Sequence, residues 1–276
     1  MNHTLSVFSL EELALAFSLL DADEQTEHLL QSFYGNMSGG QKRLLFVAAR
    51  HSLISKGFIL PVNDPADKDV LMPDIEQMLR HLIQSKHKLL GIMENEDEET
   101  LMVHVSQGKH IYHLSKKNAV HFLGWTSPVD WIDRFTAFFR LSSAGSEILV
   151  RHDRSTLLSP VLWNKLTDED WDQSTDILTW DIPSSQKDLL IHWYRDYLAN
   201  DRLLHRISYI VQDNSGPPQA ADVLYILPDQ AGVWTVHQQP HESNTEQRIS
   251  IALLTLEEWK QQLVRFTAQL TESNPS

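Results

Sequence analysis

Residues 120–139, VHFLGWTSPVDWIDRFTAFF, and residues 249–270, ISIALLTLEEWKQQLVRFTAQL, form the pattern that decides the fold. Each stretch begins with a short apolar run and passes a capping residue. It then enters an amphipathic helix with an early tryptophan, Trp131 or Trp259. A hydroxyl cap followed by an acid three residues later satisfies free backbone N–H groups and complements the helix dipole. Each stretch therefore predicts a strand that leads into a capped helix.

The capping residues differ between the two stretches, but their spacing is the same. In the first, Ser127 is the expected N-cap and Asp130 lies three residues later, with a proline at the first helical position. In the second, Thr255 is the expected cap and Glu258 lies three residues later. A third copy, TDEDW at 167–171, shows that this motif is partly a general property of helix starts.

The order of elements before the two stretches indicates an internal duplication. A helix is expected at residues 70–86 in the first half and at residues 185–200 in the second, where Ser184 or Ser185 is the expected cap. Four strands then follow in each half, at 89–93, 101–106, 109–114 and 120–123, and at 203–212, 222–227, 232–238 and 248–254. The alternative is two unrelated α+β halves whose element orders coincide.

Three further helices are expected near the N-terminus, at residues 9–20, 24–33 and 38–56, before a short extended segment at 58–60. Ser9 with Glu12, and Ser38 with Gln41, have the spacing of capping boxes. The third helix is expected to bury a broad apolar face formed by Leu44, Leu45, Val47, Ala48, His51 and Ile54. Together these elements resemble a small winged-helix-like module in shape.

These patterns predict an α+β fold in which helix–antiparallel strands–helix units are duplicated about a pseudo-twofold around a central antiparallel sheet. The N-terminal half is expected at residues 1–141, with a helical segment at 1–60 and a helix–sheet–helix unit at 70–141. The C-terminal half is expected at 142–276, with its unit at 185–270. A linker at 62–68, a short strand at 147–150 and helical pieces within 157–180 complete the prediction.

Composition limits the function. The net charge of −14 argues against general binding of nucleic acids or anionic membranes, both of which require a basic surface. No apolar run approaches the roughly 20 residues of a membrane span, and the first ten residues do not resemble a signal peptide. The absence of cysteine excludes disulfides and thiol nucleophiles and fits a reducing cytoplasm, which is the expected location.

The motif MSGGQKR at 37–43 resembles the signature loop of ATP-binding-cassette ATPases. That function needs a G-x-x-x-x-G-K-[ST] phosphate-binding loop, and no glycine in the sequence has that context. The capping box at Ser38 explains the same residues, with two glycines that let the chain turn into the helix.

The 14 histidines raise the question of a metal site. His110 and His113 are three residues apart on an expected strand, so their side chains should point to opposite faces. His104, His113 and His121 lie on adjacent expected strands and could approach one another, although such a row is more often part of a solvated sheet face. No H-E-x-x-H motif is present, and no metal site is predicted.

The acidic residues of the sequence do not define a metal-binding or catalytic site either. Asp168, Asp170 and Asp172 resemble the start of a calcium loop, but glutamine and threonine occupy its sixth and twelfth positions. The acidic run at 94–99 is interpreted as a solvated hairpin tip, with an electrostatic contact for a basic partner as the alternative. The sequence predicts no catalytic, cofactor-binding or metal-binding residue and no cofactor, and it does not indicate which residues bind a partner.

The N-terminal stretches FSLEELALAF at 8–17 and QKRLLFVAARHSLISKGF at 41–58, followed by the two helix–strands–helix halves, resemble the EspG-type cytosolic chaperones of type VII (ESX) secretion. The resemblance implies a central antiparallel sheet, helical bundles and pseudo-twofold halves. It also implies a non-enzymatic role in keeping a helical secretion substrate soluble; the usual substrates of that family are PE–PPE heterodimers.

The function expected from the sequence is therefore that of a non-enzymatic cytosolic protein that binds a helical secreted client. One alternative is a regulator that uses the winged-helix-like segment, because the third helix has four cations, Lys42, Arg43, Arg50 and Lys56. Another is an enzyme whose carboxylate or histidine site has no sequence signature.

Overall fold

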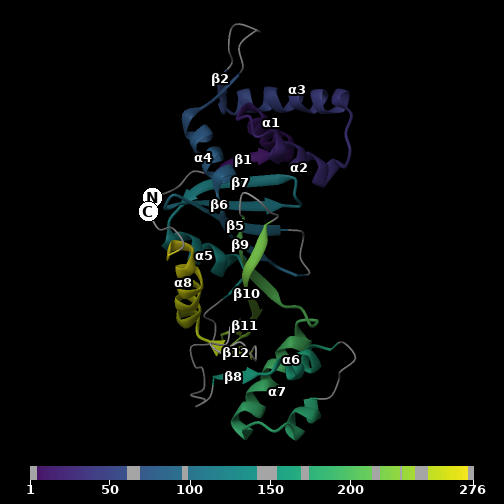
Figure 1. The fold of residues 1–276 in the computed structure, drawn as a ribbon, viewed down its shortest axis with the longest axis vertical. Helices are drawn as coiled ribbons and strands as arrows, with labels where there is room; N and C mark the ends of the chain where they lie inside the picture. The colour runs from purple at the N-terminus through teal and green to yellow at the C-terminus, as the bar shows by residue number, and fades with distance from the viewer. Residues whose placement is uncertain are drawn as a thin grey trace. The chain divides into compact units, whose positions relative to one another are not determined.

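The computed structural model describes residues 5–60, 69–94, 99–141, 154–168, 174–212, 218–230, 232–239 and 248–272. The predicted linker, the short strand at 147–150 and the third tryptophan motif at Trp171 lie outside the described residues, as does most of the acidic hairpin tip. The structure consists of α-helices and antiparallel β-strands, and this content confirms the predicted α+β class (Figure 1). The chain divides into two compact units. The first comprises Met1–Leu89, Glu96–Trp131 and Val211–Gln219, and the second Leu90–Asn95, Ile132–Ile210 and Ala220–Ser276.

The N-terminal half contains five helices and seven strands in the described residues. The helices are α1 (Leu10–Leu19), α2 (Asp23–Tyr34), α3 (Gly39–Ser55), α4 (Pro73–Gln84) and α5 (Pro128–Phe138). The sheet strands are β1 (Ser6–Ser9), β4 (His87–Ile92), β5 (Glu99–Ser106), β6 (Lys109–Lys116) and β7 (Val120–Thr126), in the order β1-β7-β6-β5-β4. A separate two-stranded ribbon joins β2 (Ile59–Leu60) to β3 (Val70–Leu71).

Local signals place the starts of α1 and α3 where the sequence predicts them. The Ser9 hydroxyl accepts the Glu12 N–H at 3.3 Å while the Glu12 carboxylate accepts the Ser9 N–H at 2.7 Å. Ser38 and Gln41 form the same reciprocal box at the start of α3. Between β5 and β6, residues 107 and 108 both have positive φ, at 49° and 71°, as a two-residue hairpin turn requires.

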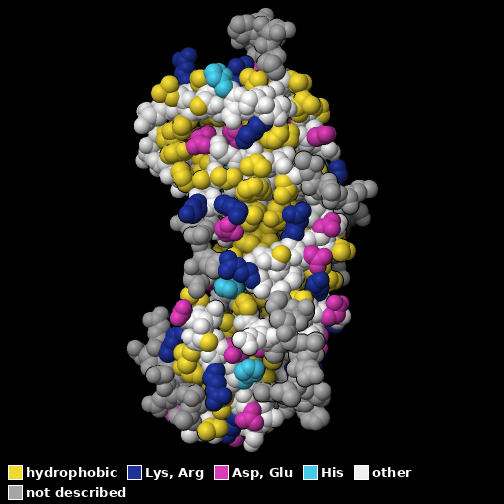
Figure 2. Space-filling view, turned by 180° about the vertical axis from the view of Figure 1, so that it is seen from behind, with side chains coloured by type: hydrophobic (Ala, Val, Ile, Leu, Met, Phe, Trp, Pro, Cys, Tyr) yellow, Lys and Arg dark blue, Asp and Glu magenta, His cyan; other side chains and the backbone are white. Residues whose placement is uncertain are grey.

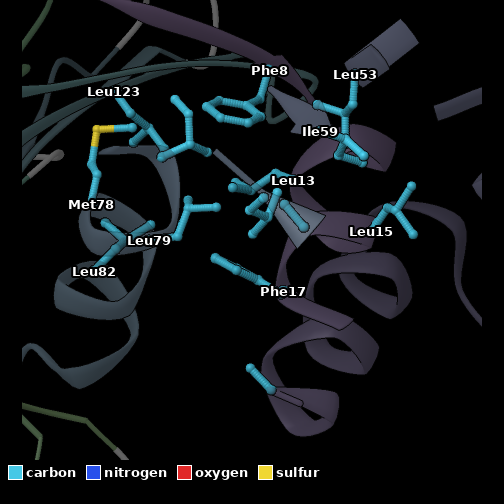
Figure 3. Packing of buried hydrophobic residues seen from close by; sticks show 14 of the residues in the cluster. Phe8, Leu13, Leu15, Phe17, Leu53, Ile59, Met78, Leu79, Leu82 and Leu123 are labelled. Carbon is cyan, nitrogen blue, oxygen red and sulfur yellow. The ribbon is translucent and has the colours of Figure 1, made fainter. Parts of the chain in front are cut away.

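The core of the first unit lies between helices and the sheet. Figure 3 shows Met78, Leu79 and Leu82 of α4 in one core with Phe8 of β1 and Leu123 of β7, where Leu79 points toward α1 and Met78 extends toward Leu123. All five side chains are buried. The helix expected at 70–86 is thus present, although α4 begins only at Pro73, the residue whose fixed φ suits a first helical position.

The predicted buried face of α3 is wrong. Leu44 is 73 % exposed and Val47 is 48 % exposed, whereas Ala49 and Leu53 are buried and Phe46 packs partly against the core. The helix has two overlapping apolar stripes, and it packs against α1 along one side. Only one stripe can face that side, so the other remains at the surface.

The C-terminal half repeats the layout of the first. Its elements are β8 (Ser155–Leu158), α6 (Pro160–Thr167), the 3₁₀ helix η1 (Ser174–Thr179), α7 (Ser184–Ala199), β9 (His205–Val211), β10 (Gln219–Pro228), β11 (Val233–Gln239), β12 (Arg248–Leu254) and α8 (Leu256–Glu272). The predicted serine cap of α7 is wrong: Pro183 occupies the N-cap position and makes no side-chain cap bond. The Pro183 carbonyl instead accepts the backbone N–H groups of Gln186 and Lys187 at 3.0 and 3.1 Å.

Strand order gives the clearest sign of the internal repeat. The order β8-β12-β11-β10-β9 in the C-terminal half corresponds element by element to β1-β7-β6-β5-β4. The first strand of each half pairs antiparallel with the last, β1 with β7 and β8 with β12. The predicted order of elements is therefore present in both halves, with an edge strand in each that the sequence did not reveal. The pseudo-twofold between the halves and the division at residues 141 and 142 stay predictions.

Both tryptophans of the capped helices are buried, as predicted, with exposed fractions of 3 % for Trp131 and 0 % for Trp259. Within the second unit, the indole N–H of Trp259 donates to the Thr136 hydroxyl at 3.3 Å, and Lys260 pairs with Asp133 at 2.7 Å. The C-terminal part of α5 therefore packs against α8.

A glycine-to-alanine pair tests the packing of α5 in the second unit. A Cβ at Gly91 of β4 would lie 2.7 Å from the Phe135 ring and 3.2 Å from the Phe139 ring. Because buried aromatic rings have little room to move, we expect Gly91→Ala to lower the free energy of unfolding by about 1–3 kcal/mol in a urea titration.

The matched control is Gly40→Ala in α3, where a Cβ would meet nothing within 4 Å. This change should be neutral or stabilise by up to about 1 kcal/mol, because alanine favours a helix. Equal effects of the two substitutions would contradict the described packing.

Candidate functional site

A cavity of about 700 Å³ lies within the first unit. Its apolar wall comes from α1, α2, α4 and β5, through Leu13, Phe17, Leu29, Leu82, Ile83 and Met102. Its polar wall includes Lys88 of β4 and one histidine from each of β5, β6 and β7. Figure 2 shows that hydrophobic side chains gather on one face of the molecule, with lysine and arginine side chains beside them. A cavity of this size and mixed lining is suited to a small ligand.

The three histidines are His104, His113 and His121, and strand register places them on one sheet face. His104 lies opposite Ile111 in the β5–β6 pair, and His113 lies opposite Leu123 in the β6–β7 pair. Since both partners belong to the helix-covered core, the histidines face the helices as well. Their predicted approach is confirmed, but the expected solvated face is wrong, because all three are buried.

The histidines and Ser85 form one continuous row of hydrogen bonds. Ser85 Oγ lies 3.0 Å from His104 Nδ1, His104 Nε2 lies 3.3 Å from His113 Nδ1, and His113 Nε2 lies 2.9 Å from His121 Nδ1. The rings follow one another in a line and do not converge on a point, so they are not arranged to chelate a metal.

The Ser85 hydroxyl sets the direction of this row. It donates to the Leu82 carbonyl at 2.9 Å, so it accepts from His104 Nδ1. A neutral imidazole has one donor and one acceptor nitrogen, and each following ring must therefore donate through Nδ1 and accept through Nε2. The row ends at His121 Nε2, a buried acceptor that makes no hydrogen bond to any residue in the described ranges.

Burial keeps the row neutral at pH 7. It lowers the pKa of His104 to about 3, with a smaller contribution from the Lys88 ammonium. Burial also lowers the pKa of His113 well below its usual value. For His121 burial lowers the pKa to about 4, against the opposing effects of the Asn118 backbone and the Glu11 carboxylate.

Lys88 is the cation at the cavity wall. Its Nζ donates to the Gln212 side-chain oxygen at 3.0 Å, and burial lowers its pKa. No carboxylate in the described ranges pairs with it, and Glu24, which also lines the cavity, makes no ion pair with it. Sequence reasoning missed this residue because nothing in the local pattern of β4 marks its surroundings. The histidines carried a weak signal, since they alternate with large apolar residues along their strands.

A second group of titratable side chains lies in the second unit. His192, Asp196 and Asp229 offer ligand atoms within 4.8 Å of one another, the only such group of three within the described part of the chain. The Trp234 indole donates to Asp196 at 2.6 Å, and burial raises the pKa of that carboxyl. All three residues are half-buried, and comparable acidic groups are common in proteins without a metal.

The cations of α3 are largely neutralised. Lys42 pairs with Glu27, Arg50 with Asp69, and Lys56 with Glu12, the last at 2.6 Å. The glycine motif at 37–43 forms the start of α3 through its capping box. Of the three aspartates Asp168, Asp170 and Asp172, only Asp168 lies among the described residues. No described helix is both long and apolar enough to cross a membrane.

Fold and cavity together define an antiparallel α+β protein built from two halves of like topology, with a ligand-sized cavity in the first unit. A family model described as "Uncharacterised protein YfjC" matches residues 5–256, and the chain belongs to this family. No curated protein matches the chain.

Among solved structures, the chain is similar to the Mycobacterium tuberculosis type VII secretion system chaperone EspG5, solved in complex with the PE25–PPE41 dimer. The sequence identity is 9 %, the TM-score is 0.57, and the match covers 93 % of each chain. At this identity the similarity shows a shared fold, which agrees with the fold implied by the EspG-type resemblance.

The histidine row predicts a pH dependence of stability. Folded-state pKa values of about 3 for His104 and 4 for His121 lie below the 6.5 of an unfolded chain, so the unfolded state takes up protons first as the pH falls. The contribution of these neutral histidines to the free energy of unfolding is complete above pH 6.5 and is lost as the pH falls toward 4. The loss is up to about 1.4 kcal/mol per pH unit for each histidine.

Urea titrations at pH 7.0, 6.0 and 5.0 measure this slope. His104→Gln cannot titrate, so it should reduce the slope by about one proton relative to the unmodified protein. An unchanged slope would show that His104 is not a buried neutral imidazole.

Proposed function

We propose that this protein is a non-enzymatic cytosolic binding protein that keeps a helical secreted client soluble before export, in the manner of a type VII secretion chaperone. The observation that carries the proposal is the similarity to EspG5 along 93 % of both chains, since that protein was solved bound to a protein dimer. The family description adds no activity, so the client is inferred from the fold and the surface.

The exposed side of α3 supports a protein partner. Leu44 and Val47 are three residues apart on one helix face and largely exposed, although both are apolar. A shallow groove of about 400 Å³ beside them is lined by Leu15, Gly39, Lys42, Arg43, Phe46, Val47 and Arg50. A client helix with an apolar stripe would complement the exposed apolar side chains of this surface.

The alternative of a DNA-binding regulator is less well supported. Three of the four cations on α3 and at its C-cap already pair with carboxylates of the same unit, which leaves little positive charge for phosphate groups. The net charge of −14 acts in the same direction.

Affinity purification from the native cytosol after mild cross-linking tests the proposal. We expect mass spectrometry to identify a helical protein that is also found in the culture medium. Leu44→Asp should reduce its recovery by about tenfold or more, because a charge in the centre of an apolar contact must be desolvated.

Val161→Asp is the matched control. Val161 is 76 % exposed on α6, so its substitution places the same charge at a similarly exposed apolar position in the other half. Recovery of the client should be unchanged. Absence of a reproducible secreted partner, or equal losses in both variants, would contradict the proposal.

A further inference from the structure

The cavity of the first unit contains a cation that no carboxylate of the described residues neutralises. Lys88 contributes an ammonium group whose hydrogen-bond partner is the neutral Gln212 amide. Both Lys88 and Gln212 line the cavity. Leaving a charge partly desolvated without a counter-charge costs free energy, and an anionic occupant that pairs with it offsets this cost.

The remaining wall indicates the rest of the occupant. Leu13, Phe17, Leu29, Leu82, Ile83 and Met102 form an apolar lining from four elements. A volume of about 700 Å³ is sufficient for a hydrocarbon chain of moderate length. An entirely apolar molecule would leave the Lys88 ammonium without a counter-charge, and a small inorganic anion would leave the apolar wall uncovered.

We propose that this cavity binds a fatty-acid-like carboxylate, whose head group pairs with Lys88 and whose chain lies against the apolar wall. The site is separate from the exposed α3 surface assigned to the client, so it stands or falls independently of the chaperone function. Glu24 also lines the cavity and makes no ion pair with Lys88 in the described residues.

The neutral histidine row explains why Lys88 is the only cation that would meet the head group. Each imidazole uses its N–H in the row, and the free end is an acceptor, so none of the three donates to a carboxylate.

Titration of the full chain with dodecanoate and with its methyl ester, both below their aggregation concentrations, tests the site by calorimetry. The two probes share the hydrocarbon chain and differ in charge. We expect saturable one-to-one binding of the acid and binding of the ester that is weaker by about tenfold or more, because only the acid pairs with Lys88. Equal binding of both probes, or binding of neither, overturns the proposal.

Lys88→Met keeps a long side chain and removes the charge. We expect it to lower the affinity for dodecanoate by about tenfold or more and to leave ester binding unchanged. Lys42→Met, which removes a surface cation of the α3 groove, is the control and should leave the acid's affinity unaltered. Should Lys88→Met fail to fold, the acid-against-ester comparison on the unmodified protein still decides. Equal affinities for the acid in Lys88→Met and in the unmodified protein would overturn the proposal.

Discussion

The fold depends on the pairing of the first strand of each half with the last. In the N-terminal half β1 pairs antiparallel with β7, and the Leu10 N–H then donates to the Ala119 carbonyl at 2.9 Å, so α1 starts directly at the sheet. The chain between these strands must leave the sheet and return to it. Because β1 and β7 are neighbours, α1 and α4 are brought over the sheet face that contains Leu123, and the core forms there.

When the helices cover this face, they also bury three histidines that share it with the core residues, and burying polar side chains costs free energy. The three imidazoles are neutral, and their hydrogen bonds run in a single direction between Ser85 and His121. A row of neutral rings satisfies every nitrogen but the last. The cavity beside the row, with Lys88 at its wall, is where the helices do not fill the space over the sheet.

The proposed binding function is argued from several observations on the described residues. The described residues hold a histidine row that is neutral and extended, and the one group with metal-ligand spacing is half-buried and shares a carboxylate with an indole. Apolar side chains remain exposed on α3, and the cations beside them are largely paired within the unit.

The sequence alone determined the features that act within one or two turns of chain. Caps at Ser9, Ser38 and Thr255 bond to groups three residues away, so their spacing was sufficient to predict the helix starts. Burial and long-range pairing were decided only by the tertiary structure. The four-residue strands β1 and β8 exist because distant strands pair with them, and α3 buries one of its two stripes because α1 lies on that side. The sequence pattern of the histidines fits either a solvent-exposed or a helix-covered sheet face. Whether their face is exposed or covered depends on helices from other parts of the chain. The local sequence of the strands does not show whether those helices pack against them.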